Sequence, residues 1–357
     1  MLDEILQSDL VKRIYISSQQ WISAGLILVT CLLSGCGTPT IITGRPDALQ
    51  PRGVAASNIS DLWWIMFWLS LVVAIVVFAL LLYPVLMRIR QGRAHDLEEV
   101  SLEAPSGRAW LWWGGIILPG IIIAITFIAS LGSMAFLERP PEQETVTIEV
   151  IGRQWFWQVR YPDGEFDTAN EIHIPVGQPV MFRLSSNDVI HSFWIPQLHG
   201  KMDLNPHRTN TIWIQADEPG IYRGLCAEFC GLQHAKMQFL VIAESPEEFA
   251  AWVERERQDA AEPQGEMAVR GRELFMSSSC VFCHTVRGTE ARGNIGPDLT
   301  HIGSRLTIGA AALDNNRGNL GGWIVNPQHV KPGVLMPPTD LESEDLQILL
   351  AYLESLR

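Results

Sequence analysis

The sequence predicts a multidomain membrane protein, in which a two-helix transmembrane hairpin precedes an all-β domain and a separate C-terminal domain. Two uncharged stretches in the first 137 residues are each longer than the roughly 20 apolar residues that cross a bilayer. Short alternating segments follow them, divided by Pro, Gly, Asn and Asp. The six cysteines of the 357-residue chain form three close pairs, at 31 and 36, 226 and 230, and 280 and 283, which indicates a separate role for each pair.

The composition excludes several classes of protein. Charged residues make up 18% of the chain and hydrophobic residues 47%, which excludes a disordered protein. The net charge of −13 argues against nucleic acid as a partner. Most of that charge lies in residues 138–264, which hold 20 acidic and 10 basic residues. This section is interpreted either as a soluble domain kept away from an anionic membrane surface or as a docking face for a basic partner.

Residues 1–36 are predicted to form a lipoprotein-type signal peptide. Two basic residues precede an apolar stretch over 21–33, which is too short to span a bilayer easily. The run Leu-Ser-Gly-Cys then ends at Cys36 and resembles the bacterial lipoprotein signal, in which the cysteine thiol accepts a diacylglyceryl group. The alternative is an ordinary signal peptide followed by a chance cysteine. Residues 37–60 are rich in turn-forming residues and are predicted as an external linker.

The membrane region is predicted over residues 61–137, with helices at 62–87 and 110–137. Tryptophans near their ends are typical of interfacial aromatic belts. The loop between the helices contains four arginines, so the positive-inside rule places it in the cytoplasm, although its carboxylates dilute the contrast. Both chain ends then lie on the outer side of a bacterial plasma membrane, periplasmic or extracellular, and the protein is multi-pass.

Residues 138–258 are predicted to form an antiparallel β-sandwich or barrel. Alternating side chains predict strands over 146–150, 171–174, 180–184, 211–214 and 239–242. Ser245 and Glu248 have the spacing of a capping box, which predicts that a helix begins there.

A cluster of soft metal ligands lies in this domain, where Cys226, Cys230, His234 and Met237 follow one another at spacings of 4, 4 and 3. Thiols with an imidazole are typical of copper, zinc or iron–sulfur sites. Zinc has little use for a thioether, whereas copper electron-transfer sites combine Cys and His with a weak Met ligand. A disulfide between the two cysteines is the alternative for an exported domain. Among the other histidines His191 is the best candidate for a further ligand.

Several stretches together resemble subunit II of the haem–copper cytochrome c oxidases, over roughly residues 58–258. They are Gln154-Trp155-Phe156-Trp157, His191-Ser192-Phe193-Trp194-Ile195-Pro196, Lys201-Met202-Asp203 and the segment from Cys226 to Met237. The resemblance implies two N-terminal membrane helices followed by a cupredoxin-like barrel that carries the dinuclear copper centre CuA.

The resemblance also implies roles for single residues. Cys226 and Cys230 would bridge the two copper ions, and His191 and His234 would each bind one of them. The weak axial ligands would be Met237 and the backbone carbonyl of Glu228.

Two further roles follow from the same resemblance. The side chain of Glu228 would help to hold Mg²⁺ at the interface with subunit I. Trp155 would be the exposed aromatic residue at which electrons enter; the alternative is a core tryptophan in a strand, which is the expectation for Trp157.

The C-terminal part begins after a predicted linker over 259–265 and covers residues 266–357. Cys280-Val-Phe-Cys283-His284 is the attachment signature of haem c, in which both thiols bond the haem and the histidine binds its iron. A redox-active dithiol would need a βαβ pattern around it, and the sequence contains no such pattern here.

The remaining iron ligand is expected downstream of this motif, as a Met or a His. Met336 precedes a predicted helix over 343–356, and this order resembles a small all-α class I cytochrome c. His301 and His329 are rival ligands, whereas Met276 lies too close upstream. The resemblance also matches residues 296–299 to the loop that packs beside the proximal histidine.

The two resemblances join in caa-type oxidases, whose subunit II carries a fused cytochrome c. They imply that electrons pass from an external redox donor to haem c, then to CuA, and then to subunit I, which reduces oxygen to water and pumps protons. One alternative is the electron-transfer subunit of a CuA-containing nitric oxide reductase. Another is a stand-alone membrane-tethered electron carrier, against which the helix pair argues because one anchor would suffice.

Overall fold

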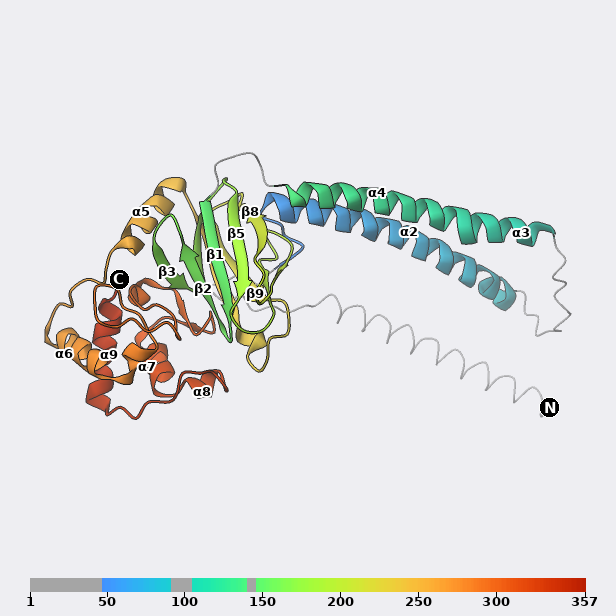
Figure 1. Ribbon diagram of the computed structural model, residues 1–357. Coiled ribbons are helices and arrows are strands. Elements are labelled where there is room, and N and C mark those ends of the chain that lie inside the picture. Colours follow the sequence, from blue (N-terminus) through green and yellow to red (C-terminus); the bar gives the residue numbers. More distant parts are fainter. Residues whose placement is uncertain (1–46, 91–104, 140–145) are drawn as a thin grey trace, which may run out of the picture. The chain divides into compact units, whose positions relative to one another are not determined.

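The computed structural model describes residues 47–90, 105–139 and 146–357. Within them the predicted architecture of two apolar helices, a β domain and a helical C-terminal domain is confirmed (Figure 1). The predicted signal peptide and Cys36 lie outside the described residues.

Two helical segments are long and apolar enough to cross a membrane, over Val54–Met87 and Gly107–Glu138. The first belongs to α2, Val54–Arg90, and the second comprises α3, Pro105–Trp112, a π-helical turn over Trp113–Ile117, and α4, Leu118–Glu138. Their large apolar side chains are mostly exposed within the chain, as expected for side chains that face lipid.

α2 begins eight residues before the uncharged stretch that predicted it, because its first turn lies against the β domain. The backbone N–H of Ala56 donates to the carbonyl of Leu198 at 3.2 Å, and that of Arg52 donates to Gln197 at 2.7 Å. Ala55 and Ala56 are buried there. The linker predicted over 37–60 is therefore helical from Val54 onward, since length and apolarity mark only the part of a helix that enters the bilayer.

The β domain, residues 146–258, contains two five-stranded sheets, a short 3₁₀-helix over His234–Lys236 and one α-helix (Figure 1). The strands are β1 Val146–Arg153, β2 Phe156–Tyr161, β3 Phe166–Ala169, β4 Glu171–Pro175, β5 Val180–Ser186, β6 His191–Trp194, β7 Met202–Leu204, β8 Asn210–Ile214, β9 Gly220–Cys226 and β10 Gln238–Glu244. All five predicted strands are present, and each is longer than predicted by up to three residues.

The sheets are mixed rather than purely antiparallel. One has the order β3-β2-β1-β5-β8 and the other β4-β10-β9-β6-β7, and the pairs β1–β5 and β4–β10 are parallel. Alternate side chains of the strands face the core, where Trp157, Phe193 and Phe239 are buried together. The rings of Phe193 and Phe239 stack with centroids 4.5 Å apart. Trp157 is thus a core residue, as expected.

The helix α5, Pro246–Arg257, closes this domain and begins at the predicted capping box. The Ser245 side chain accepts from the N–H of Glu248 at 3.2 Å, and the Glu248 carboxylate accepts from the N–H of Ser245 at 3.1 Å. Trp252 on this helix stacks on the ring of His173 with centroids 4.0 Å apart. His173 is accordingly held by packing and by the Glu244 carboxylate.

The C-terminal domain, residues 266–357, is built from short helices around a second core. They are α6 Glu266–Ser277, α7 Arg317–Val325, α8 Pro327–Val330 and α9 Ser343–Ser355, with a small hairpin of β11 Thr307–Ile308 and β12 Leu313–Asp314. The helix predicted over 343–356 is confirmed to within one residue. α6 and α9 approach closely because Gly271 has no side chain: a Cβ there would lie 2.0 Å from the carbonyl oxygen of Ile348.

Candidate metal and haem sites

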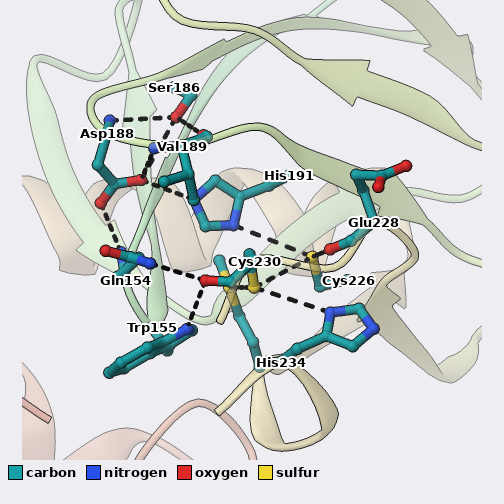
Figure 2. A network of polar contacts seen from close by, with 11 residues as sticks. Gln154, Trp155, Ser186, Asp188, Val189, His191, Cys226, Glu228, Cys230 and His234 are labelled. Atoms are coloured by element: carbon teal, nitrogen blue, oxygen red, sulfur yellow. Dashed lines mark hydrogen bonds and ion pairs between the residues drawn. The ribbon is translucent and has the colours of Figure 1, made fainter. Parts of the chain in front are cut away.

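One buried cluster brings together the soft donor groups of the β domain (Figure 2). They come from the start of β6, the end of β9 and the loop that leads to β10, and they are His191, Cys226, Cys230, His234 and Met237. β6 and β9 are antiparallel neighbours whose register pairs Phe193 with Cys226. This strand pairing carries His191 to the thiols, although 35 residues separate it from Cys226 in the sequence.

The two thiols form the centre of the cluster. Their Sγ atoms lie 3.8 Å apart. His191 Nδ1 lies 3.9 Å from Cys226 Sγ, and His234 Nδ1 lies 3.7 Å from Cys230 Sγ. Met237 Sδ lies 3.7 Å from Cys230 Sγ. A disulfide needs sulfur atoms about 2.05 Å apart, so the two cysteines are free and the disulfide alternative is wrong for this structure.

Glu228 contributes its backbone rather than its side chain to this cluster. Its carbonyl oxygen lies 3.2 Å from Cys226 Sγ. The carboxylate is exposed and points away from the thiols (Figure 2). The two parts of Glu228 are therefore free to serve different ligands, as the resemblance implies.

The donor set fits copper. Cys226 and Met237 are 3% and 0% exposed, so soft sulfur atoms line a buried site. A thiolate is the form that binds metal. The contact between the two thiols lowers the pKa of Cys226, with His191 acting in the same direction, and raises the pKa of Cys230. Two adjacent thiols, each with its own imidazole, suit a pair of ions that share the sulfur atoms.

Asp188 orients one of the imidazoles, and the sequence interpretation missed it. Its Oδ1 lies 2.8 Å from His191 Nε2, which leaves Nδ1 facing Cys226. Burial opposes the charge on Asp188, but hydrogen bonds from His191 and from the N–H groups of Gln154 and Val189 outweigh burial and lower its pKa. Asp188 therefore stays ionised and fixes the ring. Its position three residues before His191 was the available signal.

Trp155 is bonded directly to the backbone of the cluster. Its Nε1 donates to the carbonyl of Cys230 at 3.0 Å, and Gln154 Nε2 donates to the same oxygen at 2.7 Å (Figure 2). The indole is partly buried against the core of the β domain. It is thus neither the free surface residue nor the fully buried core residue that were the two expectations.

The C-terminal domain presents the haem-attachment motif around a short helical turn over Ser279–Phe282. Cys280 and Cys283 are free and partly exposed. His284 Nδ1 lies 2.8 Å from the carbonyl oxygen of Pro297, and burial lowers the pKa of His284, so the ring is neutral with Nε2 available. A Cβ on Gly296 would lie 2.6 Å from His284 Cε1, so the loop at 296–299 does pack on this ring. These groups fit haem c with His284 as an iron ligand.

The three candidates for the other iron ligand differ in what they already contact. His301 is buried and its Nε2 lies 3.1 Å from the carbonyl oxygen of Gln258, the residue that follows α5. His329 is exposed on α8. Met336 lies in the loop before α9, which Gln328 holds through a hydrogen bond from its Nε2 to the Met336 carbonyl at 2.9 Å. The hydrogen bond from Gln328 thus fixes the backbone of Met336.

Comparisons with known proteins match the two domains that contain these sites. A family model described as cytochrome C oxidase subunit II, periplasmic domain, matches residues 164–244, and one described as cytochrome c matches residues 268–357. The solved periplasmic domain of subunit II of cytochrome oxidase (CoxB) from Bradyrhizobium japonicum is 34% identical, covers 32% of this chain and 95% of its own, and has a TM-score of 0.31.

Two curated relatives are similar along nearly the whole chain. Cytochrome c oxidase subunit 2 of Alkalihalophilus pseudofirmus is 37% identical over 338 residues, which are 93% of this chain and 96% of that protein. The protein of the same name from Bacillus subtilis is 30% identical over 351 residues, with the same two coverages. The chain therefore belongs to the family of cytochrome c oxidase subunit 2.

Proposed function

We propose that this chain, an electron-transfer subunit of a terminal oxidase, passes single electrons from its C-terminal domain through the cluster of its β domain to the catalytic subunit I. The observation that carries the proposal is the buried cluster around Cys226 and Cys230, in a chain that also holds a haem-attachment motif. When bound, dinuclear copper and haem c supply one-electron redox chemistry.

The β domain contributes a site whose ligands keep their positions when an electron arrives or leaves. His191, Cys226, Cys230, His234, Met237 and the carbonyl of Glu228 would hold the copper ions. The strands β6 and β9 and the core beneath them fix these groups, so their positions depend on packing and not on the metal alone.

The C-terminal domain contributes the attachment of the haem. Cys280 and Cys283 would bond it covalently, and His284 and Met336 would bind its iron. The Pro297 carbonyl orients the ring of His284, which matches the second contact that metal-bound histidines usually make.

The membrane helices and the partners complete the proposal. Two apolar helices and the family place the protein in a membrane with a periplasmic domain. We propose that both helices span a bacterial plasma membrane, with the β and C-terminal domains on the outer side. Subunit I receives the electrons and reduces oxygen, and an external redox protein supplies them. The exposed Glu228 carboxylate is available to Mg²⁺ at the boundary with subunit I, a role that rests on the resemblance alone.

Replacing Met237 by Leu tests the copper ligands. The substitution removes the thioether but keeps a buried apolar side chain, so the copper absorption spectrum should shift while the haem content stays unchanged. Met181→Leu, on β5 in the same domain, serves as the matched control and should leave both spectra unaltered. An unchanged copper spectrum in Met237→Leu would refute its role as a ligand.

Replacing Met336 by Ala tests the iron ligand. A thioether ligand raises the haem reduction potential, so its loss should lower the potential and make the iron more accessible to added ligands, with the haem still attached through its thioether bonds. Redox titration of the full chain measures this. Met267→Ala on the exposed face of α6 is the control. If His329→Ala lowers the potential and Met336→Ala does not, His329 is the ligand.

Lipid attachment at Cys36 is a separate proposal about residues outside the described part of the chain. Mass spectrometry of the mature protein should find Cys36 as its first residue, carrying a diacylglyceryl group. A mature chain that still begins at Met1 contradicts this proposal.

A further inference from the structure

Two ionisable side chains are buried where the C-terminal domain meets the β domain, and burial lowers the pKa of one of them, Lys331, to about 7. Lys331, from the C-terminal domain, is 1% exposed, and Glu171, from the β domain, is 4% exposed. A buried charge is costly unless hydrogen bonds replace its water. For both side chains, some or all of the hydrogen-bond partners that take the place of water belong to the other domain.

Lys331 connects the segment before Met336 to Trp155. Its Nζ donates to the carbonyl of Trp155 at 2.9 Å and to that of Gly309 at 3.0 Å. The indole of the same tryptophan donates to the carbonyl of Cys230 at 3.0 Å. A single run of bonds therefore leads from the C-terminal domain to a proposed copper ligand.

The chain on both sides of Lys331 is attached to the loop that carries His234. Gln233 Nε2 donates to the carbonyl of Pro332 at 2.7 Å, and Lys236 Nζ donates to that of Val330 at 2.5 Å. These two donors flank His234, and the two acceptors flank Lys331. The contact thus joins the copper-ligand loop to the segment that leads to the proposed haem ligand.

Apolar contact accompanies these hydrogen bonds. A Cβ on Gly333 would lie 3.1 Å from Leu232 Cδ1 and 3.9 Å from Trp155 Cη2. The backbone at Gly333, where φ is +89°, therefore passes close to Leu232 of the ligand loop and to the edge of the indole. The C-terminal domain therefore approaches the edge of the indole, and the Trp155 side chain is only partly exposed.

Glu171 makes a second attachment away from Trp155. Its Oε1 accepts from the N–H of Thr307 at 2.7 Å and from its hydroxyl at 2.9 Å, and its Oε2 accepts from the N–H of Leu306 at 3.0 Å. Arg305 Nη2 donates to Thr168 Oγ1 at 3.2 Å beside it. Charge-assisted hydrogen bonds of this kind are strong and directional, so two separate contacts fix the orientation of one domain on the other.

We propose that Lys331 and Glu171 are positioning residues that lock the C-terminal domain onto the Trp155 face, so that Trp155 is an internal relay and not a landing site for external donors. The inference rests on the proposed function. One electron crosses this contact, the C-terminal centre is oxidised as the centre in the β domain is reduced, and no covalent bond changes. Tethering by a linker only raises local concentration, whereas this lock also fixes orientation.

The test uses the full, metal-loaded and haem-loaded chain with Lys331→Met and Glu171→Gln. Arg270→Met and Glu273→Gln remove exposed charges from the C-terminal domain and are the matched controls. Amide hydrogen exchange reports docking through the N–H groups of Leu306 and Thr307. Photochemical reduction of the haem reports the rate of electron transfer within the chain.

Both variants should speed exchange at 306–307 and slow the intrachain transfer by about tenfold or more, because small displacements are costly in a positioned reaction, and the controls should match the wild type. If both variants have the same hydrogen-exchange rate and the same electron-transfer rate as the wild type, the proposal is overturned. If the variants lose their cofactors, amide hydrogen exchange in the wild-type protein is the test. Exchange at 306–307 that is as fast as exchange in the linker 259–265 contradicts the proposed lock. Failure of the proposed function would appear separately, as absence of copper or haem from the wild-type chain.

Discussion

The pairing of β6 with β9 is the contact on which the proposed copper site depends. It sets Cys226 opposite Phe193 and so brings His191 to the thiols. The pairing is supported from below by Phe193, Phe239 and Trp157, whose rings fill the space between the sheets. Gly152 on the neighbouring sheet leaves room for the imidazole, since a Cβ there would lie 2.6 Å from His191 Cδ2. The ligand positions are therefore a property of the packed sandwich.

The same loop that holds the proposed copper ligands also forms much of the boundary with the C-terminal domain. Gln233 and Lys236 face that domain while His234 between them faces Cys230. Trp155 is shared in the same way, because its indole binds the Cys230 carbonyl and its own carbonyl accepts from Lys331. Ligand geometry and domain docking are thus two uses of one short stretch of chain.

Many elements of the fold could be predicted from the sequence, because each depends on a local pattern of residues. The strands, the capping box at Ser245, the terminal helix and the haem motif each depend on residues close together in the chain. The start of α2 could not be predicted, because its first turn follows contacts with Leu198 rather than apolar length. The parallel pairing of β1 with β5 was also missed, since alternation gives a strand but not its neighbour.

The site could be predicted only in part: the metal ligands could be found from the sequence, and the residues that support them could not. The ligand types stand out by spacing, but Asp188 and Glu171 look like ordinary acidic residues in an acidic domain. Lys331 is 176 residues from Trp155, and its burial follows from the docking of two domains that the sequence presents as tethered by a linker. Such long-range partners become visible only when the fold is known.

Above all, we propose that Cys226 and Cys230 would together hold two copper ions in a chain that also binds haem. Elemental analysis of the purified full chain, combined with haem quantification, tests it most directly. We expect two copper ions and one haem per chain. Replacing both cysteines by Ser should remove both copper ions and leave the haem in place. A single copper ion, zinc in its place, or copper that survives the double replacement would contradict it.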